Sequence, residues 1–423
     1  HYRDSIREPM NDFFRFQNKA LISATPIVPE KDSRFDGFMR VLIQPDYVYR
    51  QKLKLITTNN VLETLQEVIE AKRGTVCIFC NSIDSIDSFY RLIPELSNAC
   101  TFCSEDGQYK LWKGNRRKKS MMITELERYN FFTSRFYSAV DILCKNPPHV
   151  IFVSDLYGAA QSVIDPATEA IQIIGRFRGG VNSVTHIASI RPELECMSSS
   201  EIDHWIQGAS TIFNGWKSQL ARTTNIGERT LLQEAIGENS YLPYLDENGK
   251  PDSFLIANFY EKEQVKRLYT STDLLHLAYE QTGYFVFSHE ERLMPVSDNE
   301  RMAIQHRLAK KKRAELIVRK LEEMEKMSKA TDKKIQKRYQ RMLMNLITST
   351  ADRYIYDCFC RFGAEFVREA DYNENKLRTA LNVSSEHTIK KSGQMRTYIQ
   401  RAFPVGAEIS VQEAKSMLRQ VYK

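Results

Sequence analysis

The sequence has no apolar run of the about 18–20 residues that a helix needs to cross a membrane, so we expect no membrane partner. It has no initiator methionine, and the first residues, His1-Tyr2-Arg3-Asp4, show neither a signal peptide nor a transit pattern. We therefore expect these residues to come from the interior of a longer protein. The eight cysteines show no disulfide framework, which favours a reducing, cytoplasmic location.

The composition is that of an ordinary globular protein. At 423 residues the chain should hold two or three domains of about 100–200 residues each. Hydrophobic residues make up 42% of the chain and charged residues 27%, which matches typical globular usage. The net charge of +7 is small for this length, so the distribution of the cations is more informative than their sum.

Four cysteines form two C-x-x-C pairs, Cys77/Cys80 and Cys100/Cys103, whose separation would suit a zinc site. Both pairs lie in apolar runs that lack the turn residues of a zinc knuckle. In an extended strand, residues three apart point to opposite faces, so the two thiols of a pair would diverge. We predict buried free thiols and no metal site, with zinc binding as the alternative.

Strands and helices alternate from about residue 50 to residue 195. Apolar runs predict strands over residues 75–80, 99–103, 130–133, 149–154 and 184–190. Helices are expected over residues 61–71, 83–96 and 116–129, and a short helix carries Gln172. This pattern predicts an α/β fold, a parallel sheet flanked by helices, followed by a mainly α-helical C-terminal region.

The stretch from Asp165 to Asn182 carries Gln172, and Gly175, Arg176 and Arg178 follow closely. Arginine binds phosphate bidentately through its planar, permanently charged fork. Two arginines beside glycines at a helix end therefore suit an anion such as a triphosphate. The alternative is a solvated basic helix end before a Gly-Gly turn.

Four segments stand in a characteristic order. Ser23-Ala24-Thr25 follows an expected short strand, Ala20–Ile22, and Asn81-Ser82 follows the strand over residues 75–80. The third segment starts at Thr133 and has Ala139, Val140, Asp141 and Ile142 six to nine positions later. The fourth segment is Gln172-Ile-Ile-Gly175-Arg176. They resemble motifs III, IV, V and VI of superfamily 2 (DEAD/DEAH-like) helicases, over roughly residues 15–195. Ala139 replaces the usual Gly, and Arg178 follows Arg176 by two residues instead of three.

The resemblance implies a RecA-like fold and a set of roles. Residues 1–48 would hold the end of a first RecA-like domain and a linker, and residues 49–195 the second RecA-like domain. Catalytic arginines would be Arg176 and Arg178, which would reach the γ-phosphate of ATP. The implied ATP-binding residues are Gln172, Gly175, Asp141 and Ala139. The implied nucleic-acid contacts are Thr133, Ser134, Asn81 and Ser82, and the coupling residues are Ser23 and Thr25.

Two elements of the family are missing from the chain. It has no G-x-x-x-x-G-K-[ST] loop, and Asp246-Glu247 lacks the apolar strand that precedes a magnesium-binding DExx box. The resemblance therefore implies that the phosphate loop and the Mg²⁺ ligands belong to a first RecA-like domain of the same protein. Alone, this chain is not expected to hydrolyse ATP.

The remainder is expected to form a mixed α/β accessory region over residues 196–300 and a basic helical region over residues 301–423. Residues 301–348 read as one long helical region or as two helices. Four consecutive cations, Lys310, Lys311, Lys312 and Arg313, are candidates for phosphate contact. The alternative is a solvated face that nearby glutamates partly neutralise.

The leading hypothesis is the C-terminal part of an ATP-dependent nucleic-acid helicase or translocase that acts on DNA in preference to RNA. Two alternatives stay open. One is a degenerate, non-catalytic helicase module that binds nucleic acid or a protein partner. The other is an unrelated α/β nucleotide-binding protein.

Overall fold

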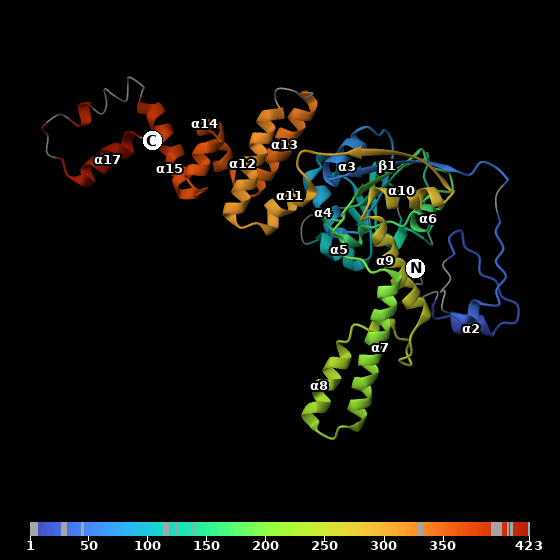
Figure 1. Ribbon diagram of the computed structural model, residues 1–423. Coiled ribbons are helices and arrows are strands. Elements are labelled where there is room, and N and C mark those ends of the chain that lie inside the picture. The colour runs from blue at the N-terminus through green and yellow to red at the C-terminus, as the bar shows by residue number, and fades with distance from the viewer. Residues whose placement is uncertain are drawn as a thin grey trace. The chain divides into compact units, whose positions relative to one another are not determined.

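The computed structural model describes residues 7–26, 32–43, 46–112, 118–123, 125–138, 140–327, 333–390, 400–403, 406 and 409–421. The chain divides into two compact units, residues 1–294 and residues 295–423 (Figure 1). Among the described residues, no helix is long and apolar enough to cross a membrane.

In the described part of the first unit, eight parallel strands form one sheet. In chain order they are β1 (Gln51–Thr58), β2 (Val76–Phe79), β3 (Cys100–Phe102), β4 (Lys118–Ser120), β5 (Tyr129–Phe132), β6 (His149–Ser154), β7 (Ser183–Ser189) and β8 (Phe285–Arg292). Their order across the sheet is β4-β3-β5-β2-β6-β7-β1-β8, and every neighbouring pair is parallel. The predicted α/β architecture with a parallel sheet is therefore confirmed.

Both faces of the sheet are buried. Along β2, Ile78 packs with α3 (Val61–Glu70) and α4 (Ile83–Leu92), whereas Cys77 and Phe79 belong to a second apolar cluster. That second cluster contains residues of α6 (Glu169–Gly175), α9 (Ser253–Leu268) and α10 (Thr272–Gln281). Helices on both faces explain why an inner strand such as β2 is apolar without alternation, because neither of its faces meets water.

Two expectations about this unit need correction. The helix expected over residues 116–129 is wrong: Lys118–Ser120 is strand β4, paired with Cys100–Phe102, and the helix in this region, α5 (Glu105–Trp112), lies upstream. Pairing with a neighbouring strand outweighs the local helical pattern. The sheet also continues beyond residue 195, because Phe285–Arg292 pairs along the whole length of β1.

A two-helix arm projects from the sheet (Figure 1). It consists of α7 (Ser199–Arg222) and α8 (Ile226–Gly237), which lie in the accessory region expected over residues 196–300. Ser198 and Glu201 form a capping box at the start of α7, which satisfies two backbone N–H groups that the helix leaves free.

A buried hydrogen-bond chain joins the sheet to α9 and α10. Tyr269 Oη donates to the carbonyl oxygen of Ile164 at 2.6 Å and accepts from Ser154 Oγ at 3.1 Å. Ser154 Oγ must therefore accept from His186 Nε2, also at 3.1 Å. This leaves His186 Nδ1 unprotonated, and it accepts from Tyr279 Oη at 2.7 Å. The imidazole is neutral, and burial lowers its pKa to about 3.

The second unit is helical. Its described helices are α11 (Asp298–Met302), α12 (Lys310–Met327), α13 (Lys333–Ser349), α14 (Arg353–Glu369), α15 (Glu374–Lys390) and α17 (Val411–Val421), with a π-helical turn over Ala303–Arg307. Apolar residues of α12, α13, α14 and α15 share one core, which includes Ile317, Leu343, Ile355 and Leu377. The helical region predicted over residues 301–348 is thus mainly the two helices α12 and α13.

His186 should make the stability of the first unit depend on pH. The unfolded state takes up a proton near pH 6.5, whereas the folded state does so only near pH 3, so stability falls as pH decreases through this window. Lowering the pH from 7 to 5 should cost about 2 kcal/mol through this residue. Tryptophan fluorescence during urea unfolding follows this unit alone, because Trp112, Trp205 and Trp216 all lie within it.

The variant His186→Gln should lose most of this pH dependence, and His204→Gln, on the exposed surface of α7, should keep it. Equal losses of stability between pH 7 and pH 5 in the wild type and in His186→Gln would show that the buried imidazole is not responsible.

Candidate functional site

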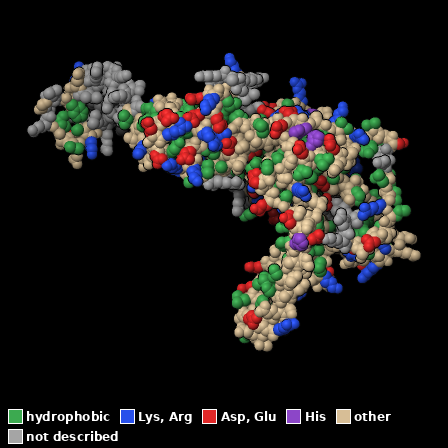
Figure 2. Space-filling view, viewed as in Figure 1, with side chains coloured by type: hydrophobic (Ala, Val, Ile, Leu, Met, Phe, Trp, Pro, Cys, Tyr) green, Lys and Arg blue, Asp and Glu red, His purple; other side chains and the backbone are tan. Residues whose placement is uncertain are grey.

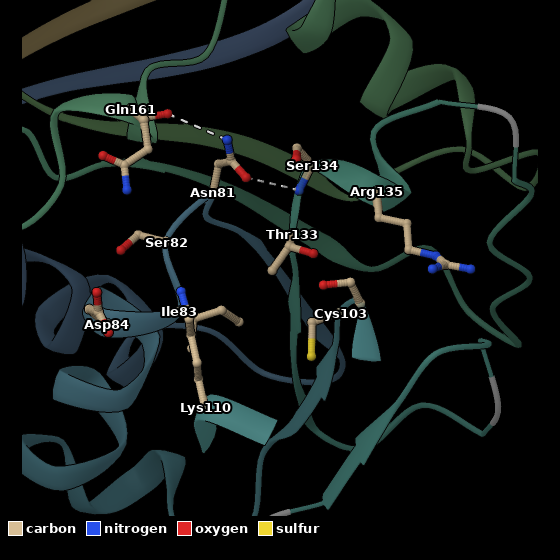
Figure 3. Close-up of a pocket in the computed structure, with 11 residues that line it drawn as sticks. Asn81, Ser82, Ile83, Asp84, Cys103, Lys110, Thr133, Ser134, Arg135 and Gln161 are labelled. Carbon is tan, nitrogen blue, oxygen red and sulfur yellow. Dashed lines mark hydrogen bonds between the residues drawn. The ribbon is translucent and has the colours of Figure 1, made fainter. Parts of the chain in front are cut away.

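A pocket of about 360 Å³ opens at the carboxyl ends of three neighbouring strands (Figure 3). Its lining residues follow β2, β3 and β5 or come from α5 and the residues after β6: Asn81, Ser82, Ile83, Asp84, Cys103, Ser104, Lys110, Thr133, Ser134, Arg135 and Gln161. In parallel α/β sheets, this edge is where ligands bind. The four residues expected to contact nucleic acid, Asn81, Ser82, Thr133 and Ser134, therefore lie together in one pocket.

Asn81 connects the two sides of the pocket. Its Oδ1 accepts from the backbone N–H of Ser134 at 3.4 Å, and its Nδ2 donates to the carbonyl oxygen of Gln161 at 3.4 Å (Figure 3). These bonds hold the ends of β2 and β5 and the segment around Gln161 in fixed positions. Asn81 thus has a structural role in shaping the pocket.

The hydroxyl groups of Ser82 and Thr133 are also engaged by the protein. Ser82 Oγ accepts from the backbone N–H of Ser85 and caps α4, while Thr133 Oγ1 donates to the carbonyl oxygen of Phe102 at 3.4 Å. Only 5% of Ser82 and 9% of Thr133 is exposed. Their side chains position the pocket wall and leave contact with a ligand to more exposed neighbours.

Two cations that the sequence analysis did not select border the pocket. Lys110 comes from α5, and Arg135 from the short 3-10 helix Ser134–Phe136; both side chains are exposed (Figure 3). Arg135 stands only two residues after Thr133, so its position in the motif could have indicated it. No sequence pattern indicated Lys110, because no helix was expected where α5 lies. The carboxylate of Asp84 lies at the same pocket and partly offsets this positive charge.

The cysteines lie where strands were predicted. Cys77 and Cys100 are buried in β2 and β3, and Cys80 and Cys103 are buried immediately after them. Burial raises the pKa of Cys103 to about 11, so this pocket thiol stays protonated at neutral pH. Among the described residues, no three His, Cys, Asp or Glu side chains lie together as metal ligands.

The arginines lie apart from the pocket, at the end of α6. Arg176 Nε donates to the carbonyl oxygen of Gln172 at 3.0 Å, and Nη1 donates to that of Val140 at 3.5 Å. Arg178 forms an ion pair with Asp141 at 3.0 Å, and 62% of its side chain is exposed. The backbone N–H of Ile142 donates to the carbonyl oxygen of Arg176 at 2.9 Å.

These contacts bring together the segments expected to bind nucleotide. Asp141 lies beside the arginines, Gln172 lies on α6, and Gly175 is the last residue of that helix. A Cβ atom on Gly175 would meet nothing within 4 Å, so packing does not require glycine there. Ala139 lies outside the described residues.

The N-terminal segment contacts the same helix. Gln172 Nε2 donates to Thr25 Oγ1 at 2.6 Å, and Ser23 Oγ accepts from the backbone N–H of Thr25 at 3.1 Å. The strand expected at Ala20–Ile22 is wrong: these residues have no strand partner, and Ile22 is 94% exposed. An apolar sequence forms a strand only where another strand pairs with it.

The basic run on α12 is largely neutralised within its own unit. Lys310 pairs with Glu374, Lys311 with Asp371 at 2.6 Å, and Arg313 with Asp352 at 2.7 Å. Lys312 is exposed on the same helix. Because three of the four cations already face a carboxylate, the charge available to a phosphate is much smaller than the sequence indicates. Asp352 is the N-cap residue of α14, Asp371 follows the end of that helix and Glu374 begins α15, so the neutralising residues do not come from the glutamates of α12.

No model of a known protein family matches this chain, and a search of curated proteins finds none with a significantly similar sequence. The proposed function therefore rests on the geometry of the pocket and of helix α6 with the two arginines that follow it.

The Thr25–Gln172 bond should hold the N-terminal segment against α6. Removing the hydroxyl in Thr25→Val loses one hydrogen bond, worth about 1 kcal/mol, so the segment should open about fivefold more often. Tryptic cleavage after Lys19, followed by mass spectrometry, measures this opening. Thr25→Ser, which keeps the hydroxyl, should behave as the wild type. Equal cleavage rates in Thr25→Val and the wild type would show that the bond does not hold the segment.

Proposed function

We propose that this chain supplies the second RecA-like domain of a superfamily 2 nucleic-acid helicase or translocase, together with the accessory regions that follow it. One observation carries the proposal: a single pocket joins the two segments that resemble motifs IV and V. Asn81 and Ser82 come from one segment and Thr133 and Ser134 from the other, with Asn81 and Ser134 53 residues apart. A coincidental resemblance would not require them to meet.

The chemistry of the pocket suits a nucleic-acid strand. Lys110 and Arg135 offer positive charge to phosphates, and the side chains of Ser104, Ser134 and Gln161 offer hydrogen-bonding groups beside them. The contact is proposed to be with the backbone and independent of sequence. DNA in preference to RNA, and a cytoplasmic location, stay predictions.

Arg176 is the residue proposed to reach the γ-phosphate of ATP. A guanidinium has five N–H donors; here Nε and Nη1 donate to backbone carbonyl oxygens, which fixes the orientation of the group. This donor set fits a phosphate and not a cation. Hydrolysis of ATP, when bound between two such domains, would supply the free energy for movement along a strand.

The Mg²⁺ ligands and the phosphate loop are proposed to come from a first RecA-like domain. The N-terminal segment offers a surface for such a domain, since Ile22, Met39, Leu42 and Ile43 are apolar and more than 80% exposed. Burying apolar side chains of this size would stabilise the contact by about 1.5–3 kcal/mol each. The Thr25–Gln172 bond would then join the first domain to α6.

One observation favours the degenerate module as a second candidate. Arg178, the other proposed catalytic arginine, is paired with Asp141 and faces solvent. A phosphate would have to compete with this carboxylate. If Arg176 is the acting arginine, the pairing of Arg178 is compatible with a motor; if Arg178 is required, the pairing favours binding without turnover.

Replacing Arg176 tests the proposed activity. In the protein that carries this chain and the first RecA-like domain, Arg176→Ala should lower nucleic-acid-stimulated ATP hydrolysis about 10³-fold, because an arginine finger contributes 10³–10⁵ in rate. Arg178→Ala is the matched control and should lose less than tenfold. Unchanged stimulated turnover in Arg176→Ala would refute the proposed role of α6.

The pocket cations have their own test. The double variant Lys110→Gln/Arg135→Gln should weaken the binding of a single-stranded oligonucleotide to this chain, and the slope of log K against log salt should fall by about 1.4, or 0.7 for each phosphate contact. Lys217→Gln/Arg222→Gln, two exposed cations of α7, makes the same change in charge and should keep the slope. Equal slopes in both double variants would place the strand elsewhere.

A further inference from the structure

Helix α13 differs in charge from the rest of the second unit. Its 17 residues, Lys333–Ser349, include five cations, Lys333, Lys334, Lys337, Arg338 and Arg341, and no Asp or Glu. The helix therefore contains no carboxylate three or four positions away that could neutralise its lysines.

Among the described side chains elsewhere in this unit, most cations have a carboxylate partner. Figure 2 shows acidic and basic side chains interspersed over its surface. The pairs outside α13 include Lys310–Glu374, Lys311–Asp371, Arg313–Asp352, Arg319–Glu300, Lys320–Glu300, Arg353–Asp357, Arg368–Glu322 and Arg378–Glu374. Within the described residues, Lys333 and Lys337 are exposed and have no such partner. Their charge is therefore available to another molecule.

The exposed face of α13 is continuous. Its described exposed residues, Lys333, Lys337, Gln340, Arg341, Asn345 and Thr348, follow helical spacing over 15 positions, or about 22 Å at 1.5 Å per residue. Each is a cation or an uncharged side chain that can donate a hydrogen bond. These residue types make most contacts to phosphate and sugar in protein–DNA interfaces.

The opposite face of the helix is fixed within its own unit. Leu343, Leu346 and Ile347 belong to the apolar core, and Tyr339 Oη donates to the carbonyl oxygen of Lys320 at 2.8 Å. A helix that lies in a membrane surface needs apolar side chains free to enter the lipid. The described apolar side chains of α13 are buried or partly buried in the unit, which argues against lipid as the partner of this face.

We propose that the exposed face of α13 binds the phosphate backbone of a nucleic-acid duplex, as a second contact besides the pocket. A rigid, straight row of donors matches a rigid duplex with regularly spaced phosphates. The inference rests on the proposed function only in the choice of nucleic acid as the polyanion.

The test uses the whole chain and compares two exposed lysines of α13 with two lysines of α12 that form ion pairs. Binding of a fluorescent 20-base-pair duplex is measured by anisotropy over a range of salt concentrations. Lys333→Gln/Lys337→Gln should reduce the slope of log K against log salt by about 1.8, or 0.9 for each phosphate contact. Lys310→Gln/Lys311→Gln removes the same charge from paired positions and should leave the slope unchanged.

Two further variants and probes make the outcome decisive. Lys333→Arg/Lys337→Arg should restore the slope, and unchanged circular dichroism in all variants shows that the helix stays folded. Single-strand binding should depend on Lys110 and Arg135 and not on Lys333 and Lys337. Equal slope changes in the two Lys→Gln pairs would overturn the proposal, because net charge alone would explain them.

Two other results would also overturn it. One is a slope that Lys333→Gln/Lys337→Gln leaves unchanged. The other is binding of phosphatidylserine vesicles, but not of duplex, that depends on these lysines. Failure of the helicase proposal is seen separately, as stimulated ATP hydrolysis that Arg176→Ala does not change.

Discussion

All strands of the sheet run in one direction, and the position of the site depends on this parallel pairing. Parallel pairing requires a crossover between successive strands, and it places all carboxyl ends at one edge. Apolar clusters cover both faces, so the edge is where polar side chains can meet a ligand. For this reason Asn81 and Ser134, far apart in the sequence, are joined by a hydrogen bond at one pocket.

Two polar contacts of different kinds hold helix α6, which precedes Arg176 and Arg178. On one side Gln172 binds Thr25 of the N-terminal segment; before the helix, Tyr269 binds both backbone groups of Ile164. The first contact is partly buried and within reach of a domain that covers the N-terminal segment. The second is fully buried and belongs to the fixed core. In the proposed motor, α6 would thus be anchored to its own sheet while remaining coupled to the first domain.

The sequence was sufficient for five of the described strands because these are largely apolar, as in Val76–Phe79 and in the run Val150–Val153 within His149–Ser154. It was not sufficient for β1, which lies inside the sheet, or for the edge strands β4 and β8: Gln51–Thr58, Lys118–Ser120 and Phe285–Arg292 contain polar residues and are strands because of their neighbours. At the site, motif spacing identified Asn81 and Thr133 but not Lys110, which only folding brings to the pocket. The neutralisation of the run Lys310–Arg313 could not be predicted, because its carboxylate partners lie 39 to 64 residues away in the sequence.

Hydrogen exchange of this chain with and without a single-stranded oligonucleotide tests most directly whether nucleic acid binds at the carboxyl edge of the sheet. The proposed site predicts slower exchange of backbone amides at residues 81–84, 104–110 and 133–136, three of the segments that line the pocket. It predicts no change at the opposite edge, at residues 75–76 and 149–150, where β2 and β6 begin. Protection at that opposite edge, or none in the three pocket segments under saturating oligonucleotide, would contradict it.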